Sequence, residues 1–158
     1  MSASTVKKVL VRRFDRETLN GFVNPLSYLQ ALNVELLRPE GTLVLLPYEE
    51  IKTVSFVKDF DSDEEPNRIF MTRPKLDGVW VRMQFRDGDQ LDGILPNDLL
   101  SWETAGFTVT PPEADANNQR VFVPRQALRK IQVMGIVGSP LRPKRRKMTS
   151  PDQGALFS

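Results

Sequence analysis

The sequence of 158 residues contains no cysteine and no histidine. The absence of cysteine excludes disulfides, thiolate metal sites and a cysteine nucleophile. The absence of histidine removes the side chain that most often acts as a general base or binds a transition metal. The sequence also lacks a glycine-rich phosphate loop, a paired-carboxylate signature and a nucleophile elbow. We therefore expect a protein that is not an enzyme and that holds no metal or cofactor.

Long apolar runs are missing as well. No segment approaches the ~20 apolar residues that cross a bilayer. Charges at Lys7, Lys8, Arg12 and Arg13 interrupt the N-terminal stretch, where a secretory signal would have an apolar core. These observations predict a cytoplasmic protein without membrane contact.

The charges are distributed unevenly along the chain. Residues 139–158 hold five basic residues and one acidic residue, a net charge of +4, whereas residues 1–138 hold 17 basic and 19 acidic residues, a net charge of −2. The same last segment contains three prolines, so it is predicted to be a disordered tail. The body itself has no charge excess that would attract nucleic acid.

Two stretches of the body are similar to each other. "VLVRRFDRETLNGF", from Val9, and "VWVRMQFRDGDQLDGI", from Val79, both show the alternation of strands around a polar turn. The pair Asp87-Gly88 is a strong hairpin signal. After each turn comes a Leu-x-Gly sequence containing Gly21 or Gly93, and a glycine within a strand indicates a bend or a close backbone approach. We therefore predict a repeated hairpin.

The repeat extends further along both halves. "LVLLPYEEIKTVSFV", from Leu43, and "RVFVPRQALRKIQVM", from Arg120, each predict a strand, a 3₁₀ turn opened by Pro47 or Pro124, and a last strand. The repeat therefore predicts a mainly all-β chain made by duplication of one small unit.

Each unit resembles an SH3-like or Sm-like small β-barrel, over residues 6–60 and 77–138. The resemblance implies two tandem barrels, in domains 1–61 and 62–138, followed by the tail 139–158. The Asp…Asn and Arg-Gly pairs that bind RNA in Sm-like proteins are absent from the corresponding positions. RNA binding is therefore not implied by the fold.

Shorter elements are expected between the strands. Segments 24–32 and 97–104 are predicted to be short helical turns, and Asn24-Pro25 is a good start for the first of them. The connector between the units begins as an acidic loop and allows an additional strand at 68–73.

The acidic connector carries one metal-like pattern. Asp59, Asp61 and Asp63 alternate as in the opening of an EF-hand loop, but the required glycine and glutamate are missing. A solvated acidic connector is the better interpretation.

Two further patterns concern nucleotides. Arg12 and Arg16 have the Arg-x-x-x-Arg spacing of PilZ domains, which bind a cyclic dinucleotide, but the second PilZ element is absent. Several aromatic residues could stack bases, although most are expected in the core because aromatic content is only 8%. They are Phe70, Trp80, Phe85, Trp102 and Phe107.

The tail contains the most specific pattern. Gln153, Leu156 and Phe157 resemble the peptide by which many bacterial proteins bind the DNA polymerase sliding clamp. In such peptides, apolar side chains enter a preformed pocket and the glutamine amide makes hydrogen bonds at its rim. Gly154 stands where leucine is usual and raises the entropy cost of binding. The basic residues that would contact the DNA backbone nearby are Lys144, Arg145, Arg146 and Lys147.

Two hypotheses follow. The first is a non-enzymatic adaptor that docks on the sliding clamp through this peptide, with non-specific DNA contacts from the tail. The alternative is an Sm-like or PilZ-like module that binds RNA or a nucleotide, with Arg12 and Arg16 as the phosphate contacts. The oligomeric state remains open in both.

Overall fold

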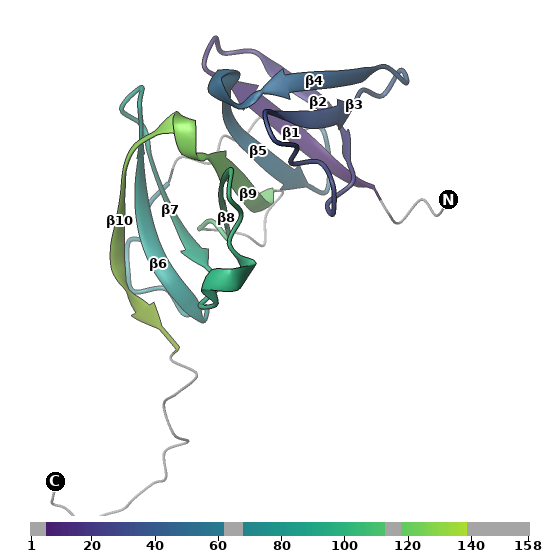
Figure 1. Cartoon of the computed structure of the whole chain (residues 1–158). Helices are drawn as coiled ribbons and strands as arrows, with labels where there is room; N and C mark the ends of the chain where they lie inside the picture. The colour runs from purple at the N-terminus through teal and green to yellow at the C-terminus, as the bar shows by residue number, and fades with distance from the viewer. Residues whose placement is uncertain (1–5, 62–67, 113–117, 139–158) are drawn as a thin grey trace, which may run out of the picture.

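The computed structural model describes residues 6–61, 68–112 and 118–138. This part of the chain is all-β, as the sequence predicts (Figure 1). Its strands are β1 (Lys7–Arg13), β2 (Thr18–Val23), β3 (Asn33–Leu37), β4 (Leu43–Pro47), β5 (Ile51–Val57), β6 (Gly78–Phe85), β7 (Gln90–Leu95), β8 (Gly106–Val109), β9 (Asn118–Pro124) and β10 (Leu128–Val137). Three 3₁₀ turns connect them: η2 (Tyr48–Glu50), η3 (Leu99–Ser101) and η4 (Arg125–Ala127). Within these residues, no helix is long and apolar enough to span a membrane.

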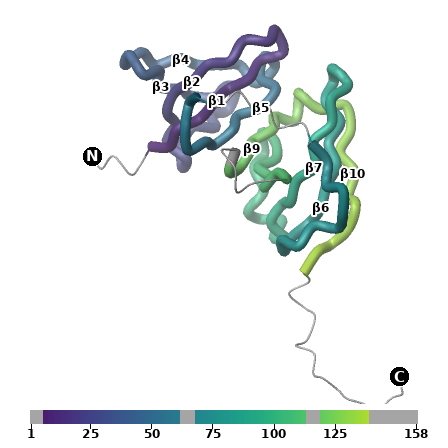
Figure 2. The backbone as a smooth tube through the Cα atoms, turned by 180° about the vertical axis from the view of Figure 1, so that it is seen from behind, coloured from purple at the N-terminus to yellow at the C-terminus, as the bar shows by residue number. Residues whose placement is uncertain are grey.

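The strands form two sheets. A seven-stranded sheet has the order β4-β3-β2-β1-β5-β9-β8, and a three-stranded sheet has the order β10-β6-β7. Figures 1 and 2, which view the molecule from opposite sides, both place β4 and β10 at opposite ends of the body. The sequence predicted two tandem barrels. The larger sheet crosses from one half of the chain to the other, because β5 pairs with β9.

The same strand order nevertheless occurs twice. In the first unit, residues 6–61, the order is β4-β3-β2-β1-β5. The second unit, residues 68–112 and 118–138, has the order β9-β8-β7-β6-β10, because an isolated bridge between Ile94 and Thr110 connects β7 to β8. The corresponding pairing of β2 with β3 is equally short and joins only Phe22 to Leu37. This agreement supports the predicted duplication.

The predicted 3₁₀ turns are confirmed in both units. Pro47 and Pro124 precede η2 and η4, each with a φ of −61°. The pyrrolidine ring fixes φ near this value, which favours the start of such a turn. Ile51 and Leu128 then begin the last strand of each unit. The positions on either side of the two turns are therefore structurally equivalent.

The first hairpin turns are equivalent as well. Arg16 and Gly88 have positive φ angles of 75° and 98° at the same place in the turn. Just before them, the carboxylates of Asp15 and Asp87 accept hydrogen bonds from backbone N–H groups two residues later, at 2.9 and 3.1 Å. The predicted hairpin at Asp87-Gly88 is thus confirmed.

The two strand glycines mark close backbone approaches, as predicted. A Cβ atom added to Gly21 would lie 2.6 Å from the carbonyl oxygen of Leu37. One added to Gly93 would lie 2.4 Å from the Cβ of Val109. Both contacts are far shorter than ordinary carbon packing distances, so glycine allows the third strand of each unit to cross closely over the second.

Each unit has its own hydrophobic core, and β9 contributes to both. Val121 and Val123 lie in the core of the second unit. Phe122 points the other way because strand side chains alternate, and it is fully buried in the core of the first unit. There it packs against the rings of Tyr28 and Tyr48, with centroid distances of 6.2 and 6.3 Å. The two units therefore share β9, whose side chains enter both cores.

Other predicted elements differ from the structure. Segment 24–32 forms one turn, in which the Asn24 carbonyl accepts the N–H of Tyr28 at 2.9 Å, and continues without a helix. Segment 97–104 contains only η3, capped by Asp98. Segment 68–73 is not a strand, although its Arg68 carbonyl accepts the N–H of Asp92 at 2.8 Å. These segments are short and depend on packing against the sheets. The predicted disordered tail lies outside the described residues.

Candidate functional site

The structure does not bring Arg12 and Arg16 together as a phosphate-binding pair. Arg12 is only 5% exposed, and its Nη1 donates a hydrogen bond to Ser55 Oγ at 3.1 Å. Arg16 is exposed on the β1–β2 turn. The buried guanidinium therefore connects β1 to β5, and the exposed one stands on a separate surface.

The predicted clamp-binding residues lie outside the described part of the chain. This applies to Gln153, Leu156 and Phe157, and also to the four basic residues that precede them, Lys144, Arg145, Arg146 and Lys147. Of the acidic connector, Asp59 and Asp61 are described and Asp63 is not. Among the described residues no group of three or more carboxylates is arranged to hold a metal ion.

Two of the five aromatic candidates belong to the interior, and Phe70, Trp80 and Trp102 are partly exposed. Phe85 is fully buried and Phe107 is 8% exposed, so both lie in the second core as expected. Trp80 packs edge-on against Phe70 and donates its indole N–H to Asp92 at 3.0 Å. Trp102 is partly exposed and lines an open cleft together with Phe107.

Asp92 is a buried carboxylate with a structural role. It is fully buried and accepts hydrogen bonds from Arg82 Nε at 2.7 Å and Arg82 Nη2 at 3.0 Å. The backbone N–H of Phe70 and the indole of Trp80 donate to the same group. A buried charge is tolerated only when it is paired and hydrogen-bonded. This arrangement fixes segment 68–70 against the outer face of β6 and β7 and leaves the carboxylate fully engaged.

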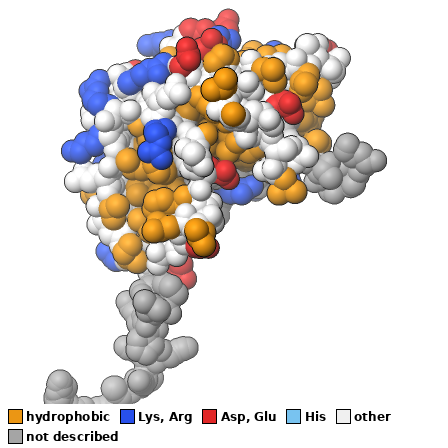
Figure 3. Space-filling view, viewed as in Figure 1, with side chains coloured by type: hydrophobic (Ala, Val, Ile, Leu, Met, Phe, Trp, Pro, Cys, Tyr) orange, Lys and Arg blue, Asp and Glu red, His pale blue; other side chains and the backbone are white. Residues whose placement is uncertain are grey.

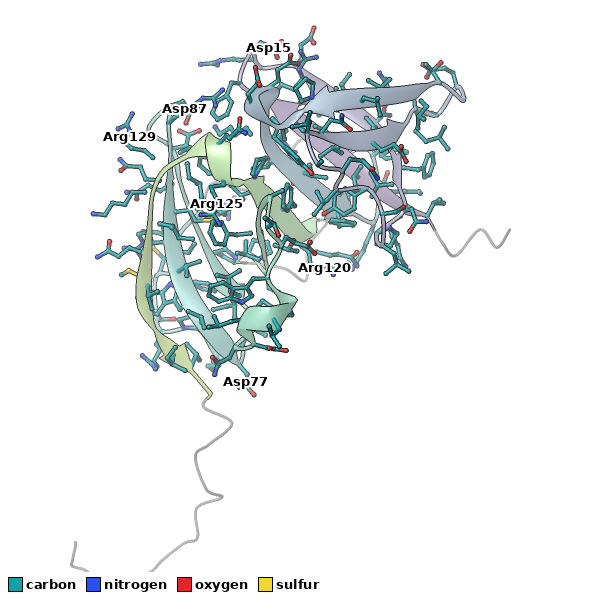
Figure 4. The ribbon with its side chains drawn as sticks, in the orientation of Figure 1. Asp15, Asp77, Asp87, Arg120, Arg125 and Arg129 are labelled. Carbon is teal, nitrogen blue, oxygen red and sulfur yellow. The ribbon has the colours of Figure 1, made fainter. Side chains whose placement is uncertain are left out.

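A cleft of about 420 Å³ lies where the two units meet. We call it the interunit cleft. Tyr28 and Phe56 line it from the first unit, and Trp102, Phe107 and Arg120 line it from the second. Figure 4 shows Arg120 between the two units. The volume lies within the ~300–1,000 Å³ range of small-molecule sites.

The charged side chains of the cleft stand close to its aromatic walls. The Arg120 guanidinium lies 4.9 Å from the centroid of the Phe56 ring, a cation–π distance. The pKa of Tyr28 is raised well above its ordinary value, first by burial and second by the negative charge of Glu103, which also lines the cleft. The cleft thus combines apolar lining residues with one cation, Arg120, and two anions, Asp77 and Glu103.

Sequence reasoning did not identify this cleft. Trp102 and Glu103 follow η3, and Arg120 lies on β9, far away in the sequence. Their positions depend on the pairing of β5 with β9, which no local pattern specifies. Of the lining residues, the sequence suggested only Trp102 and Phe107 as binding residues, among several aromatics.

An ion pair connects the two units away from the residues that line the cleft. Lys52, on β5, is 6% exposed, and its Nζ lies 2.8 Å from Asp87 Oδ2 on the β6–β7 turn. Asp89, on the same turn, forms a second ion pair with Lys52. Arg86 donates to the Glu49 carbonyl at 2.7 Å and lies 3.9 Å from the centroid of the Phe14 ring. The units are therefore joined by charge contacts as well as by strand pairing.

Comparison with known proteins gives one match. Residues 5–135 match a family of unknown function, DUF6982. No curated protein and no solved structure matches the chain. The matched range includes both units and the interunit cleft and ends before the basic tail. The chain therefore belongs to DUF6982, a family of unknown function.

Proposed function

We propose that this protein is a non-enzymatic, cytoplasmic adaptor that docks on the bacterial DNA polymerase sliding clamp. The observation that carries the proposal is the peptide Gln153–Phe157, with its glutamine followed by Leu156 and Phe157. Two adjacent apolar anchors and a polar rim contact are the elements by which an extended peptide enters a preformed pocket. The two β units would be the part carried to the clamp.

The distribution of charge supports the same proposal. The tail, residues 139–158, has a net charge of +4 and the body has −2. A clamp encircles DNA, so a basic segment beside the docking peptide would lie near phosphates. Four consecutive basic residues, 144–147, would add an attraction that depends on salt and not on sequence.

The internal contacts of the body suit it to act as one scaffold made of two joined units. Its most deeply buried charged groups make internal contacts: Arg12 binds Ser55, Lys52 binds Asp87, and Arg82 binds Asp92. These contacts stabilise the sheets and the joint between units. They favour a scaffold that presents surfaces to partners.

The clamp proposal is tested by direct binding of the full chain to a purified bacterial clamp. The variant Leu156→Ala/Phe157→Ala should bind at least about tenfold more weakly, because the apolar anchors carry most of the affinity in such peptides. Leu141→Ala/Met148→Ala, which changes two apolar residues of the same tail, is the matched control and should bind like the parent. Equal binding by both variants, or no binding by the parent, would refute the proposal.

A second variant tests whether the affinity can be increased. Gly154→Leu restores the residue usual at that position and removes the backbone freedom of glycine, so it should bind more tightly.

The basic residues are tested separately. Replacing all four residues 144–147 by alanine should leave binding to the free clamp unchanged. For a DNA-loaded clamp, a plot of log binding constant against log salt concentration should become less steep, by up to about four in slope.

The interunit cleft favours a second candidate function, the binding of a nucleotide or single-stranded RNA. The supporting observation is that Arg120 and Trp102 line the same cleft. A guanidinium can bind phosphate and an indole can contact a base. In this candidate Arg120 replaces the predicted pair Arg12 and Arg16, since Arg12 is buried.

This candidate is tested with the full chain, a cyclic dinucleotide and a short RNA at low salt. Binding should weaken about tenfold or more in Arg120→Ala and stay unchanged in Arg16→Ala, whose side chain is exposed elsewhere. Loss of binding in Arg16→Ala alone would support the sequence-based pair instead. Absence of binding by the parent would exclude this function.

A further inference from the structure

We propose that copies of this chain associate head to tail, with β10 of one copy pairing antiparallel with β4 of the next. This inference concerns a surface outside the interunit cleft and the tail. It rests on the pairing of β5 with β9 within one chain, which we call the inner joint. The two units have the same strand order, so the strands that form the inner joint each have an equivalent that is unpaired on its outer edge among the described residues.

The inner joint shows what such a pairing does. It places Val54 opposite Phe122 and Phe56 opposite Arg120. All seven residues of β5 are buried. Phe122 crosses the joint and completes the core of the neighbouring unit. At the inner joint, two strands that would otherwise be sheet edges become buried.

The equivalent edges are identified by the two proline turns. Counting back from Pro47 and Pro124, Leu45 of β4 corresponds to Phe122 of β9, and Leu43 corresponds to Arg120. Counting forward from Ile51 and Leu128, the equivalent positions are Val54 and Ile131, and Phe56 and Val133. If the inner joint is repeated between copies, Leu45 faces Ile131 and Leu43 faces Val133.

The exposed fractions of these residues agree with this pairing. Phe122 is 0% exposed and Phe56 is 4% exposed. Their equivalents Leu45 and Val133 are 55% and 61% exposed, and Leu43 is 57% exposed. Leu45 and Val133 thus occupy positions that are buried at the inner joint and uncovered at the outer edges, whereas Arg120, the equivalent of Leu43, is itself exposed. Figure 3 shows hydrophobic side chains along the top of the molecule, where β4 runs.

The charges are complementary in the same register. At the inner joint Lys52 contacts Asp87 and Asp89. The equivalent of Lys52 is Arg129, one residue after Leu128, and it is exposed. The equivalents of the two acids are Asp15 and Glu17, whose side chains are 53% and 64% exposed. Figure 4 shows Asp15 and Arg129 on different units, as the two ends of a repeated contact require.

Most of the features that prevent strand pairing are absent from these two edges, although β10 has bulges between Leu128 and Lys130 and between Val133 and Gly135. Exposed edges are normally protected by charged residues, proline or bulges. The sequence of β4 is Leu-Val-Leu-Leu-Pro, with its proline at the end. From Ile131 to Val137, β10 carries no charge. Arg73 covers the carbonyl of Ile136 at 2.7 Å, which lies beyond the proposed pairing at 131–133.

Two different edges meet in this contact, so it is heterologous: each copy offers β10 to one neighbour and β4 to another. Such contacts produce a closed ring or an open filament, depending on the rotation between copies. A symmetric dimer would pair β4 with β4 or β10 with β10 instead. The register distinguishes these arrangements.

Engineered cysteines test the register without background, because the chain contains no cysteine. The full-length variants Leu43→Cys and Val133→Cys are oxidised separately and as a mixture. Directly opposed residues on paired strands have Cα atoms about 4.5–5.5 Å apart, within the range of a disulfide. We expect a covalent dimer in the mixture only. The intrachain pair Ser55→Cys/Val121→Cys, opposed at the inner joint, is the positive control for the register.

The exposed residue Leu26, 94% exposed on the turn after β2, supplies the negative control. Leu26→Cys mixed with Val133→Cys should give no dimer. Cross-linking of Leu43→Cys or Val133→Cys with itself alone would overturn the head-to-tail proposal. So would the absence of a mixed dimer when the intrachain control forms its disulfide.

The size of the parent chain gives an independent measurement. Light scattering should show mass increasing with protein concentration, and Leu45→Lys should raise the dissociation constant at least about tenfold by placing a charge at the contact. Leu26→Lys should associate like the parent.

An exchange of charges tests the ion pair between copies. Arg129→Glu should weaken association, and the further changes Asp15→Lys/Glu17→Lys should restore it. A monomeric parent at all concentrations, or no rescue by the charge exchange, would overturn the proposal.

Discussion

The Nζ atom of Lys52 lies 2.8 Å from Oδ2 of Asp87 and joins the last strand of the first unit to the first hairpin of the second. The same ammonium pairs with Asp89 and lies 5.2 Å from the centroid of the Phe85 ring. A buried ammonium needs such compensation, since burial of an unpaired charge is unfavourable. The contact therefore contributes to the stability of the body and to the relative position of its units.

Lys52→Met removes this charge and keeps most of the apolar length of the side chain. We expect the free energy of unfolding to fall by about 1–2 kcal/mol, below the ~3–5 kcal/mol typical of a fully buried pair, because both acids remain partly exposed and can be solvated. Chemical denaturation measures the change. Lys75→Met, which alters an exposed lysine, should have almost no effect. An equal effect of both substitutions would contradict this role of Lys52.

The same contact predicts a pH dependence. Burial acts to raise the pKa of Asp87, but the hydrogen bond and charge of Lys52 and nearby backbone N–H groups outweigh it and lower the pKa below the ordinary 3.8. The unfolded chain therefore binds a proton at a higher pH than the folded chain does. The stabilisation is present above about pH 4 and is lost as pH falls through the folded pKa. Asp87→Asn should lose less stability between about pH 5 and pH 3 than the parent. A steeper loss of stability in Asp87→Asn than in the parent would show that folding does not lower the pKa of Asp87.

Asp92 provides the strongest expected effect on stability. Asp92→Ala leaves the Arg82 guanidinium and the Trp80 indole without their shared acceptor. Removal of one partner from a buried pair costs about 3–5 kcal/mol. Thermal or denaturant unfolding would show this loss, and Trp80 fluorescence would report the detachment of segment 68–70. Glu40→Ala, on the exposed β3–β4 turn, is the matched carboxylate control. A stability like that of the parent would show that Asp92 does not hold this segment.

Gly93 tests the close crossing of β7 and β8. Gly93→Ala puts a methyl group where Val109 already stands, so overpacking should cost about 1–3 kcal/mol. Val109→Ala alone should also destabilise, by leaving a cavity. The double variant should be more stable than the sum of the two single effects predicts, because Val109→Ala removes the Cγ atoms that lie 2.5 and 3.1 Å from the added methyl group, while the Cβ contact at 2.4 Å remains. Additive effects in denaturant unfolding would argue against a direct clash.

The sequence predicted the repeated elements of this fold because each depends on local chemistry. Asp87-Gly88 permits the turn between β6 and β7, and Pro47 and Pro124 fix the backbone angle that opens η2 and η4. Alternating apolar residues identify the strands around them. Each of the segments 24–32 and 97–104, predicted to be short helical turns, forms a single turn. Short segments have weak intrinsic preferences, and contacts with the sheets decide their conformation.

Some candidate sites can be recognised from the sequence alone, and others depend on the tertiary structure. Gln153, Leu156 and Phe157 form a contiguous peptide, and a contiguous peptide can be recognised from sequence alone. Arg12 and Arg16 have a suggestive spacing, but spacing does not show which side chain is buried. Arg120 and Trp102 are distant in sequence and meet at the interunit cleft only through the fold.

By itself the sequence determined the β class, the two units and the absence of cysteine and histidine chemistry. These depend on residue type and on the spacing of neighbours along the chain. Only the tertiary structure decided that β5 pairs with β9, that Phe122 belongs to the first core and that β4 and β10 remain as edges. Any of the similar strands could satisfy a neighbour's backbone hydrogen bonds. The choice among them comes from burial of side chains and pairing of charges across the whole molecule, which no short segment specifies.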